Sequence, residues 1–197
     1  TADFLPCEIE ACDALTAFGD AQASLDGLLA GRKALALTPV LGRAGGDPVP
    51  LALRGSLDET MPPRWLGAAQ MLAGQWPEGR WGHGRTPVVV TSCNFGVGSL
   101  YAYQRERDPR HLEPGAPHAA VDLIRRSLGW GDQLSIFSHA CVTSHLGLAH
   151  AARLLHAGVA DRVLVLSFDF LSPFVTGGFH SLKILNTGFP APYAVRE

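Results

Sequence analysis

The chain has 197 residues, of which 47% are hydrophobic and 17% charged, with 16 basic against 18 acidic side chains and a formal net charge of -2. This is the composition of one ordinary domain with a buried core, and it excludes a natively unfolded chain. Because the charge is near neutral and Lys or Arg form no run, nucleic acid and anionic membrane surfaces are poor candidates for partners.

The sequence predicts a soluble, cytoplasmic protein with reduced thiols. No apolar stretch approaches the ~20 residues that cross a bilayer, and Thr1–Pro6 lacks the order of residues of a secretion signal. The four cysteines are Cys7, Cys12, Cys93 and Cys141. They form no CxxC pair and lie too far apart in the sequence to indicate a disulfide framework.

The first third of the chain predicts few long elements. Loose alternation of apolar and acidic residues over Cys7–Leu15 predicts a strand. Asp20 precedes leucines at helical spacing, which predicts a capped helix over Ala21–Ala30 that ends at Gly31. Several glycines and five prolines over residues 32–63 predict an irregular surface excursion.

In the rest of the chain, predicted helices alternate with predicted strands. After a helix over Trp65–Ala73 and a loop over Gln75–Arg85, a run of β-branched residues without polar alternation predicts a strand covered on both faces. The predicted strands are Pro87–Cys93, Leu134–Ser138 and Arg162–Ser167, and the helices between them are Val97–Gln104, His118–Leu128 and Val142–Ala157. This order predicts an α/β fold with a parallel or mixed sheet between helices.

A cysteine lies where one of these strands turns into a long helix. At such a junction unpaired backbone N–H groups and the helix dipole favour negative charge, so a thiolate is stabilised there. Stabilisation of the thiolate is what turns a cysteine into a nucleophile. Cys141 is therefore the candidate nucleophile. The alternative is a small buried core residue, a common role for free cysteine.

The segment Ser138-His-Ala-Cys141-Val-Thr-Ser resembles the active-cysteine elbow of the β-ketoacyl-(acyl carrier protein) synthases, condensing enzymes of the thiolase superfamily, where it is usually Thr-Ala-Cys-Ala/Ser-Ser. Other segments resemble the same family in the same order: Ser24–Arg32, Val88–Ser92, His118–Ile124, Ala151–Val165 and Leu171–Leu182. The resemblance implies a thiolase-like half-fold, a mixed sheet covered by helices with an elbow at the cysteine. It also implies that residues 1–197 form a single ketosynthase-like amino-terminal domain.

The resemblance implies further site residues. Cys141 would accept the acyl chain, and Phe174 and Phe179 would line its tunnel. His145 replaces a residue that is usually small in the family, so it is a third candidate for the lining. Core packing is the alternative for the two phenylalanines and for the neighbouring Phe168 and Phe170. For His145 the alternative is a hydrogen bond in a subunit contact.

Neither a cofactor nor a metal ion is expected. Histidines on the predicted helix lack the spacing of a zinc site, since the one after His145 comes five residues later. Asn94-Phe-Gly96-Val-Gly98 follows a strand as a dinucleotide-binding turn would, but it lacks the third glycine. An ordinary tight turn is therefore expected there.

In the family, the two groups that complete the condensation, usually His and His or His and Asn, belong to a second half, which the resemblance does not include. It therefore implies a short subunit, similar to chain-length factors of aryl-polyene and related type II polyketide or fatty acid systems. Such a subunit pairs with a complete ketosynthase through the strand before the cysteine, here residues 133–139, and works with an acyl carrier protein. The retained Cys141 leaves a second interpretation, the amino-terminal part of a catalytic β-ketoacyl synthase. A binding module without acyl chemistry is the third.

Overall fold

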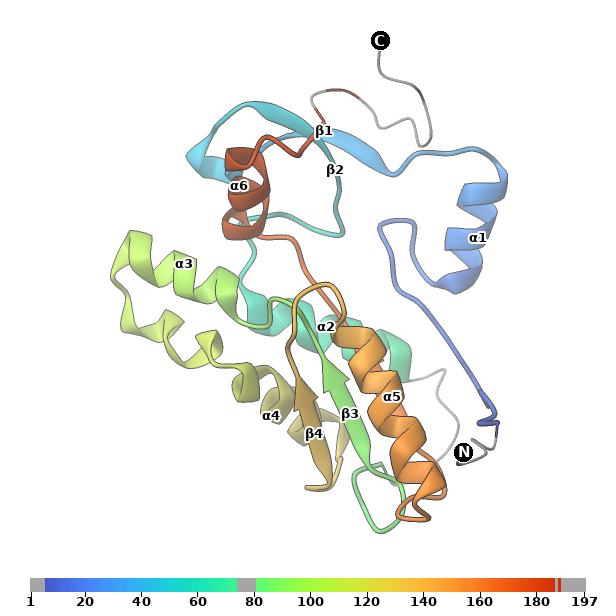
Figure 1. Cartoon of the computed structure of the whole chain (residues 1–197). Coiled ribbons are helices and arrows are strands. Elements are labelled where there is room, and N and C mark those ends of the chain that lie inside the picture. The colour runs from blue at the N-terminus through green and yellow to red at the C-terminus, as the bar shows by residue number, and fades with distance from the viewer. Residues whose placement is uncertain (1–5, 74–80, 187, 189–197) are drawn as a thin grey trace. The chain divides into compact units, whose positions relative to one another are not determined.

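Figure 1 shows a computed structural model of the chain, which describes residues 6–73, 81–186 and 188. The chain forms two compact units. The first consists of Thr1–Asp13 and Thr60–Phe170, and the second of Ala14–Glu59 and Leu171–Glu197. The ketosynthase-like domain expected over residues 1–197 stays a prediction. Most of the expected loop over Gln75–Arg85 lies outside the described residues.

A three-stranded parallel sheet is the centre of the first unit in its described part. The strands are β3 (Val88–Thr91), β4 (Leu134–Phe137) and β5 (Leu164–Ser167), in the order β4-β3-β5. Val88 pairs with Leu134 on one side and with Leu164 on the other. All four residues of β3 are buried, as expected for a β-branched run without polar alternation.

The helices of this unit begin and end close to their predicted limits. They are α2 (Met61–Ala73), α3 (Val97–Glu106), α4 (Pro117–Leu128) and α5 (Thr143–His156). Gly129 and Gly158 follow α4 and α5 with φ of 67° and 64°, the left-handed conformation that ends a helix at little steric cost. Of the helices in the described ranges, none is long and apolar enough to cross a membrane.

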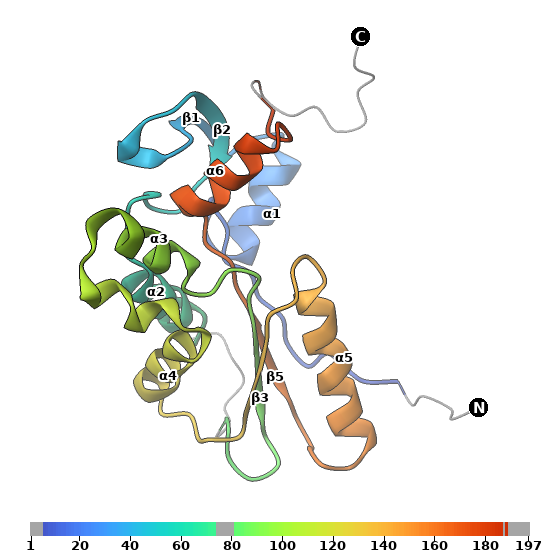
Figure 2. The same ribbon diagram turned by 60° about the vertical axis from the view of Figure 1, so that its left-hand side comes forward.

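Helices cover both faces of the parallel sheet (Figure 2). Val88 and Val90 pack in one cluster with side chains of α2 and α4. Val89 and Thr91 point to the opposite face, where Gly147 of α5 lies against both. The two faces follow from the period of two along a strand. The α/β fold class predicted from the sequence is confirmed.

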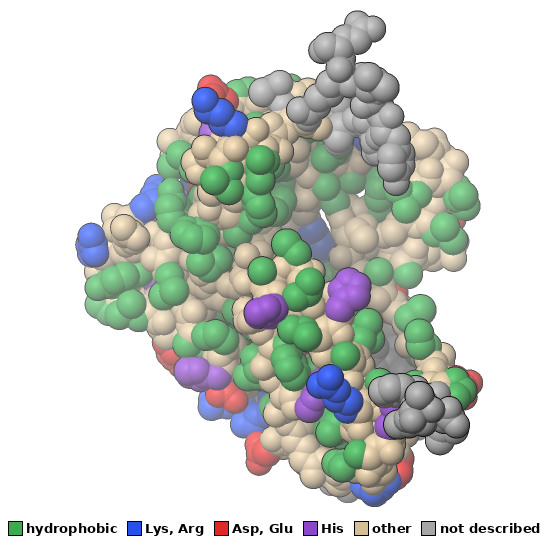
Figure 3. Space-filling model, viewed as in Figure 1, with side chains coloured by type: hydrophobic (Ala, Val, Ile, Leu, Met, Phe, Trp, Pro, Cys, Tyr) green, Lys and Arg blue, Asp and Glu red, His purple; other side chains and the backbone are tan. Residues whose placement is uncertain are grey.

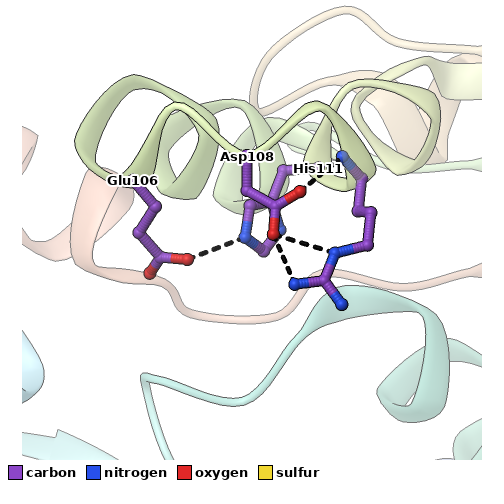
Figure 4. A network of polar contacts seen from close by, with 4 residues as sticks. Glu106, Asp108 and His111 are labelled. Atoms are coloured by element: carbon purple, nitrogen blue, oxygen red, sulfur yellow. Dashed lines mark hydrogen bonds and ion pairs between the residues drawn. The ribbon is translucent and has the colours of Figure 1, made fainter.

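Two short 3₁₀ turns, η2 (Pro109–His111) and η3 (Glu113–Gly115), connect α3 to α4. Figure 4 shows the polar network around η2, in which His111 contacts Glu106 at 2.9 Å and Asp108 accepts hydrogen bonds from Arg110. The side-chain hydrogen bonds from Arg110, and then the one from its backbone N–H, lower the pKa of Asp108 to about 2. Asp108 therefore stays ionised near neutral pH, and this contribution to stability is lost progressively as the pH falls from the ordinary pKa of 3.8 through about 2.

The second unit contains the short elements of the chain. They are α1 (Ala21–Leu29), β1 (Leu35–Pro39), η1 (Gly42–Ala44), β2 (Pro48–Ala52) and α6 (Pro173–Ser181). Asp20 caps α1 by accepting a hydrogen bond from the N–H of Ala23 at 2.9 Å, as its position predicts. The buried Thr176 of α6 donates its hydroxyl to the carbonyl of Val40, which ties α6 to the turn after β1.

The structure corrects the expected irregular excursion over residues 32–63. An antiparallel hairpin forms there, in which Leu35 pairs with Ala52 and Pro39 with Pro48. Its strands are only five residues long, and two of their three prolines, Pro39 and Pro48, lie at the strand ends, where they remove few ladder hydrogen bonds. The hairpin is kept by a small apolar cluster of Val40, Val49, Leu51 and Leu57, with Leu41, Leu53, Leu171 and Leu185 packed against it.

The strand expected over Cys7–Leu15 is also corrected, because residues 6–15 form no strand. Alternation of apolar and acidic residues predicts a strand only where a neighbouring strand covers the apolar side, and Ile9 is 78% exposed. This segment is held instead by side chains. Glu10 pairs with Arg162 at 2.8 Å, beside the start of β5.

We expect Gly147→Ala to lower the free energy of unfolding by about 1–3 kcal/mol, as overpacking does. A Cβ atom there would lie 2.5 Å from Cγ2 of Thr91, a buried residue whose hydroxyl is hydrogen-bonded to Ser167 at 2.8 Å. The matched control is Gly67→Ala in α2, where nothing lies within 4 Å. Helix propensity should then raise stability by about 0.5–1 kcal/mol. Urea unfolding of both variants measures the difference, and a stabilised Gly147→Ala protein would contradict the packing of α5 on β3.

Candidate functional site

The candidate nucleophile lies in a sharp turn between β4 and α5, at the carboxyl end of the sheet (Figure 1). Ala140 has φ of 47°, in the left-handed region that residues with a Cβ seldom adopt. Thr143, the first residue of α5, is 2% exposed and fixes this turn. Its hydroxyl accepts a hydrogen bond from the N–H of His139 and donates one to the carbonyl of Ala140, both at 2.6 Å.

Cys141 follows this strained residue, and its side chain is exposed and not part of a disulfide. The alternative of a small buried core residue is therefore excluded. Val142, the residue that precedes α5, offers no side-chain hydrogen bond to the first turn of the helix. The start of α5, two residues after Cys141, therefore leaves backbone N–H groups and the positive end of its dipole without a side-chain cap. This arrangement suits a negative charge that develops during acyl transfer.

Histidines surround the elbow without forming a metal site. His139 and His145 are exposed, one on each side of Cys141 in the sequence, whereas Nε2 of His150 lies 3.2 Å from the hydroxyl of Ser135 on β4. The ring of His150 also packs on Phe137, with centroids 5.1 Å apart. Within residues 6–73, 81–186 and 188, no three His, Cys, Asp or Glu side chains come together as metal ligands.

A second cysteine lies beside the elbow, and sequence reasoning did not single it out. Cys93 follows β3, the neighbour of β4, and its thiol donates a hydrogen bond to the carbonyl of Ala140 at 2.7 Å. The thiol also lies 4.0 Å from the hydroxyl of Thr143. Burial and then the carboxylate of Asp169 raise the pKa of the Cys93 thiol. Cys93 is therefore held as a thiol that contacts the backbone next to Cys141.

Asp169 organises the turn that carries Cys93. It follows β5, and its Oδ1 accepts hydrogen bonds from the hydroxyl of Ser92 at 2.8 Å and from the N–H groups of Cys93 and Asn94 at 2.9 and 3.1 Å. The turn is tight, with φ of 35° at Phe95. The only sequence signal for this network was the position of its members after strands that were predicted to be parallel.

Gly96 shows why this turn contains glycine. A Cβ atom at Gly96 would lie 1.9 Å from the carbonyl oxygen of Pro114 in the loop before α4. The close approach of that loop thus requires glycine, whatever the turn binds. The structure forms a tight turn that ends at Gly96, and Val97 and Gly98 are already the first residues of α3.

The aromatic candidates fall into two groups. Phe168 and Phe170 belong to the core of the first unit, where the ring of Phe168 packs edge-on against Phe95 at 5.8 Å. Phe174 and Phe179 lie on α6 of the second unit and are 51% and 45% exposed. Core packing therefore explains Phe168 and Phe170. The assignment of Phe174, Phe179 and His145 to an acyl tunnel stays a prediction.

The whole structure is similar to two solved structures of ketosynthases. One is the ishigamide ketosynthase/chain length factor, with a TM-score of 0.62 and 18% identity over 90% of this chain and 56% of that chain. The other is a beta-ketoacyl synthase from Burkholderia phymatum STM815, with a TM-score of 0.61 and 16% identity over 86% of this chain and 48% of that chain. This likeness shows that the chain shares the fold of these ketosynthases, in agreement with the fold expected from the sequence.

This chain spans about half the length of the two solved structures. No model of a protein family matches the sequence, and no curated protein matches it. The similarity therefore lies in the fold, and the residues at the elbow are the ones that bear on function.

We expect Asp169→Asn to lower the pKa of the Cys93 thiol, because the substitution removes a negative charge that disfavours the thiolate. The thiolate fraction at a given pH then rises, so alkylation of Cys93 becomes faster. Peptide mass spectrometry after timed exposure to iodoacetamide, over a series of pH values, measures this rate. Asp122→Asn on α4 is the matched control and should leave Cys93 unchanged. Equal rates in the two variants would contradict the contact with Asp169.

Proposed function

We propose that this chain is a ketosynthase-like subunit of the chain-length-factor type. It pairs with a complete β-ketoacyl synthase in the cytoplasm and shapes the acyl tunnel in a type II polyketide or fatty acid system, such as an aryl-polyene one. The observation that carries the proposal is a thiolase-like ketosynthase fold with an exposed elbow and an apolar edge strand. The likeness to a ketosynthase/chain length factor supports it.

The edge strand is β4, the strand that precedes Cys141. It is the last strand of the sheet in the described part of the chain, so one of its edges has no strand beside it. Ile136 on β4 and Val142 and Leu146 after the elbow are 40%, 48% and 39% exposed. Figure 3 shows hydrophobic and histidine side chains on the surface over the start of α5. An open apolar edge invites pairing, and a strand of the partner subunit would continue the sheet.

A partner is needed because a thiol alone cannot carry out a condensation. Orientation of the extender and stabilisation of the oxyanion supply much of the reduction in the barrier. Of the histidines near the elbow, His150 is engaged by Ser135 and packed on Phe137, so it is not available to a substrate at Cys141. The complete ketosynthase would supply the condensing groups, and an acyl carrier protein would deliver the chains.

Large apolar side chains on α6 would line the tunnel. Phe179 is 45% exposed on α6, a helix tied to the hairpin through Thr176 and packed so closely that a Cβ at Gly177 would lie 2.7 Å from Leu41. A large apolar ring on a firmly held helix suits a boundary that limits chain length. We assign the same role to Phe174 and, at the elbow, to His145.

A second candidate function is favoured by Cys141 itself, which is exposed at the elbow. In the amino-terminal part of a catalytic ketosynthase, its sulfur would attack the carbonyl carbon of an acyl thioester on the carrier protein. The carrier thiol would leave with the proton, and the acyl chain would remain on Cys141. The two functions differ in whether this transfer is required for turnover.

We expect Ile136→Asp to weaken the pairing with the ketosynthase on the order of tenfold or more, since a carboxylate would be buried at the apolar edge. Val159→Asp is the matched control, because Val159 is 56% exposed just after the opposite end of α5. Native mass spectrometry of the complex purified from its source gives the fraction of paired subunit. If both variants retain a partner of ketosynthase size equally well, β4 is not the contact.

We expect the complex that carries Cys141→Ala to form product at an unchanged rate. We expect the complex that carries Phe179→Trp to form a shorter product, because the larger ring adds bulk to the tunnel wall. Leu182→Ala, just after α6 and 67% exposed, is the control for product length. The assay supplies acyl-loaded and malonyl-loaded carrier protein and measures products by mass spectrometry. Acylation of Cys141 together with loss of turnover in Cys141→Ala would replace the proposal by the second candidate. If Phe179→Trp does not change product length, the chain is a binding module without a role in chain length.

A further inference from the structure

The two cysteines at the carboxyl end of the sheet follow neighbouring parallel strands, Cys93 after β3 and Cys141 after β4. Thr91 of β3 pairs with Phe137 of β4. The N–H of Ser92 donates a hydrogen bond to the carbonyl of Phe137 at 3.2 Å, so the two segments stay together just beyond β3. Neighbouring strands lie about 4.7–4.9 Å apart. Continued by two residues, this register leads from Cys93 to His139, two positions before Cys141, so the turn at Ala140 decides how close the two cysteines come.

Side-chain contacts bring the sulfur of Cys93 closer still to the elbow. Its Sγ donates to the carbonyl oxygen of Ala140 at 2.7 Å, and Ala140 is joined to Cys141 by a peptide bond. Both thiols are exposed, so a small oxidant reaches them. We propose that Cys93 and Cys141 form a reversible intramolecular disulfide that closes the elbow when the protein meets a low-molecular-weight disulfide such as oxidised glutathione.

The order of the two steps follows from the environments of the two sulfurs. The thiol of Cys93 is engaged by Ala140, and burial with the Asp169 carboxylate raises its pKa, so Cys141 reacts first. The sulfur of Cys141 loses its proton to solvent and attacks one sulfur of oxidised glutathione. The S–S bond breaks, one glutathione leaves as a thiolate that takes up a proton, and Cys141 carries a mixed disulfide.

Cys93 completes the reaction as the resolving thiol. It gives its proton to solvent and attacks Sγ of Cys141, and the second glutathione leaves and is protonated. Two protein thiols are thereby oxidised to one disulfide, and one molecule of oxidised glutathione is reduced to two of glutathione. Excess reduced glutathione reverses both steps. The disulfide removes the nucleophile and joins the elbow to the turn after β3, whichever proposed function holds.

The test is peptide mapping of the whole chain after treatment with oxidised glutathione and alkylation of the remaining thiols. The expected product has lost two hydrogens, contains a Cys93–Cys141 linked peptide, and returns to four alkylated cysteines after reduction. Cys7 and Cys12 are exposed as well and serve as internal controls. Cys7 is exposed like Cys141, and its sulfur lies 3.4 Å from Nε2 of His156.

A Cys93→Ser variant distinguishes the resolving step from general reactivity. Serine can still donate a hydrogen bond to the carbonyl of Ala140, so the turn is preserved, and Cys141 should then keep one bound glutathione. The wild-type protein carries the main test, so the proposal does not depend on whether this variant folds. A lasting glutathione adduct on Cys141 in the wild type, a link that uses Cys7 or Cys12 instead, or a link between two copies would overturn the proposal.

Discussion

The parallel pairing of β3 with β4 and β5 decides where the chemistry of the first unit lies. Because the three strands run in the same direction, the loops after them meet at one edge of the sheet. These loops carry Cys93, Cys141 and Asp169. The register has little freedom, since a slip of one residue would exchange the side chains of β3 that face α2 and α4 for those that lie against Gly147. The site is thus a consequence of the sheet.

The sequence predicts those parts of the fold whose signal is local. Four consecutive β-branched residues indicate a strand covered on both faces, and Gly158 and Asp20 mark helix limits through conformational freedom and capping. The prediction fails where the structure of a segment depends on residues that are distant in the sequence. The alternation over Cys7–Leu15 lacks a neighbouring strand, and the hairpin within residues 32–63 depends on leucines from the other end of the chain.

The residues of the candidate site also divide into those that a local sequence pattern predicts and those that it does not. Cys141 could be found from the residues next to it in the sequence. A cysteine between a predicted strand and a predicted helix is a local pattern, and the residues around it resemble the elbow of a known family. Cys93 and Asp169 could not be found in this way. The hydrogen bonds that place Cys93 at the elbow and Asp169 at the turn of Cys93 join residues that are 47 and 76 positions apart in the sequence. Phe168 and Phe170 show the converse limit. They belong to the same run of aromatic residues as Phe174, yet they pack in the core of the first unit.

In the subunit proposed above, an exposed sulfur beside an open edge strand is a hazard as long as the partner is not bound. Oxidation of Cys141 can end in a link to another molecule or in irreversible acids, and both would alter the surface proposed to pair. A thiol fixed at 2.7 Å from the neighbouring carbonyl competes well with both outcomes, because its effective concentration exceeds that of any thiol in solution. Asp169 strengthens this role, since it orders the turn of Cys93 and disfavours its thiolate. The same hydrogen bonds that shape the elbow therefore also hold the group that can protect it.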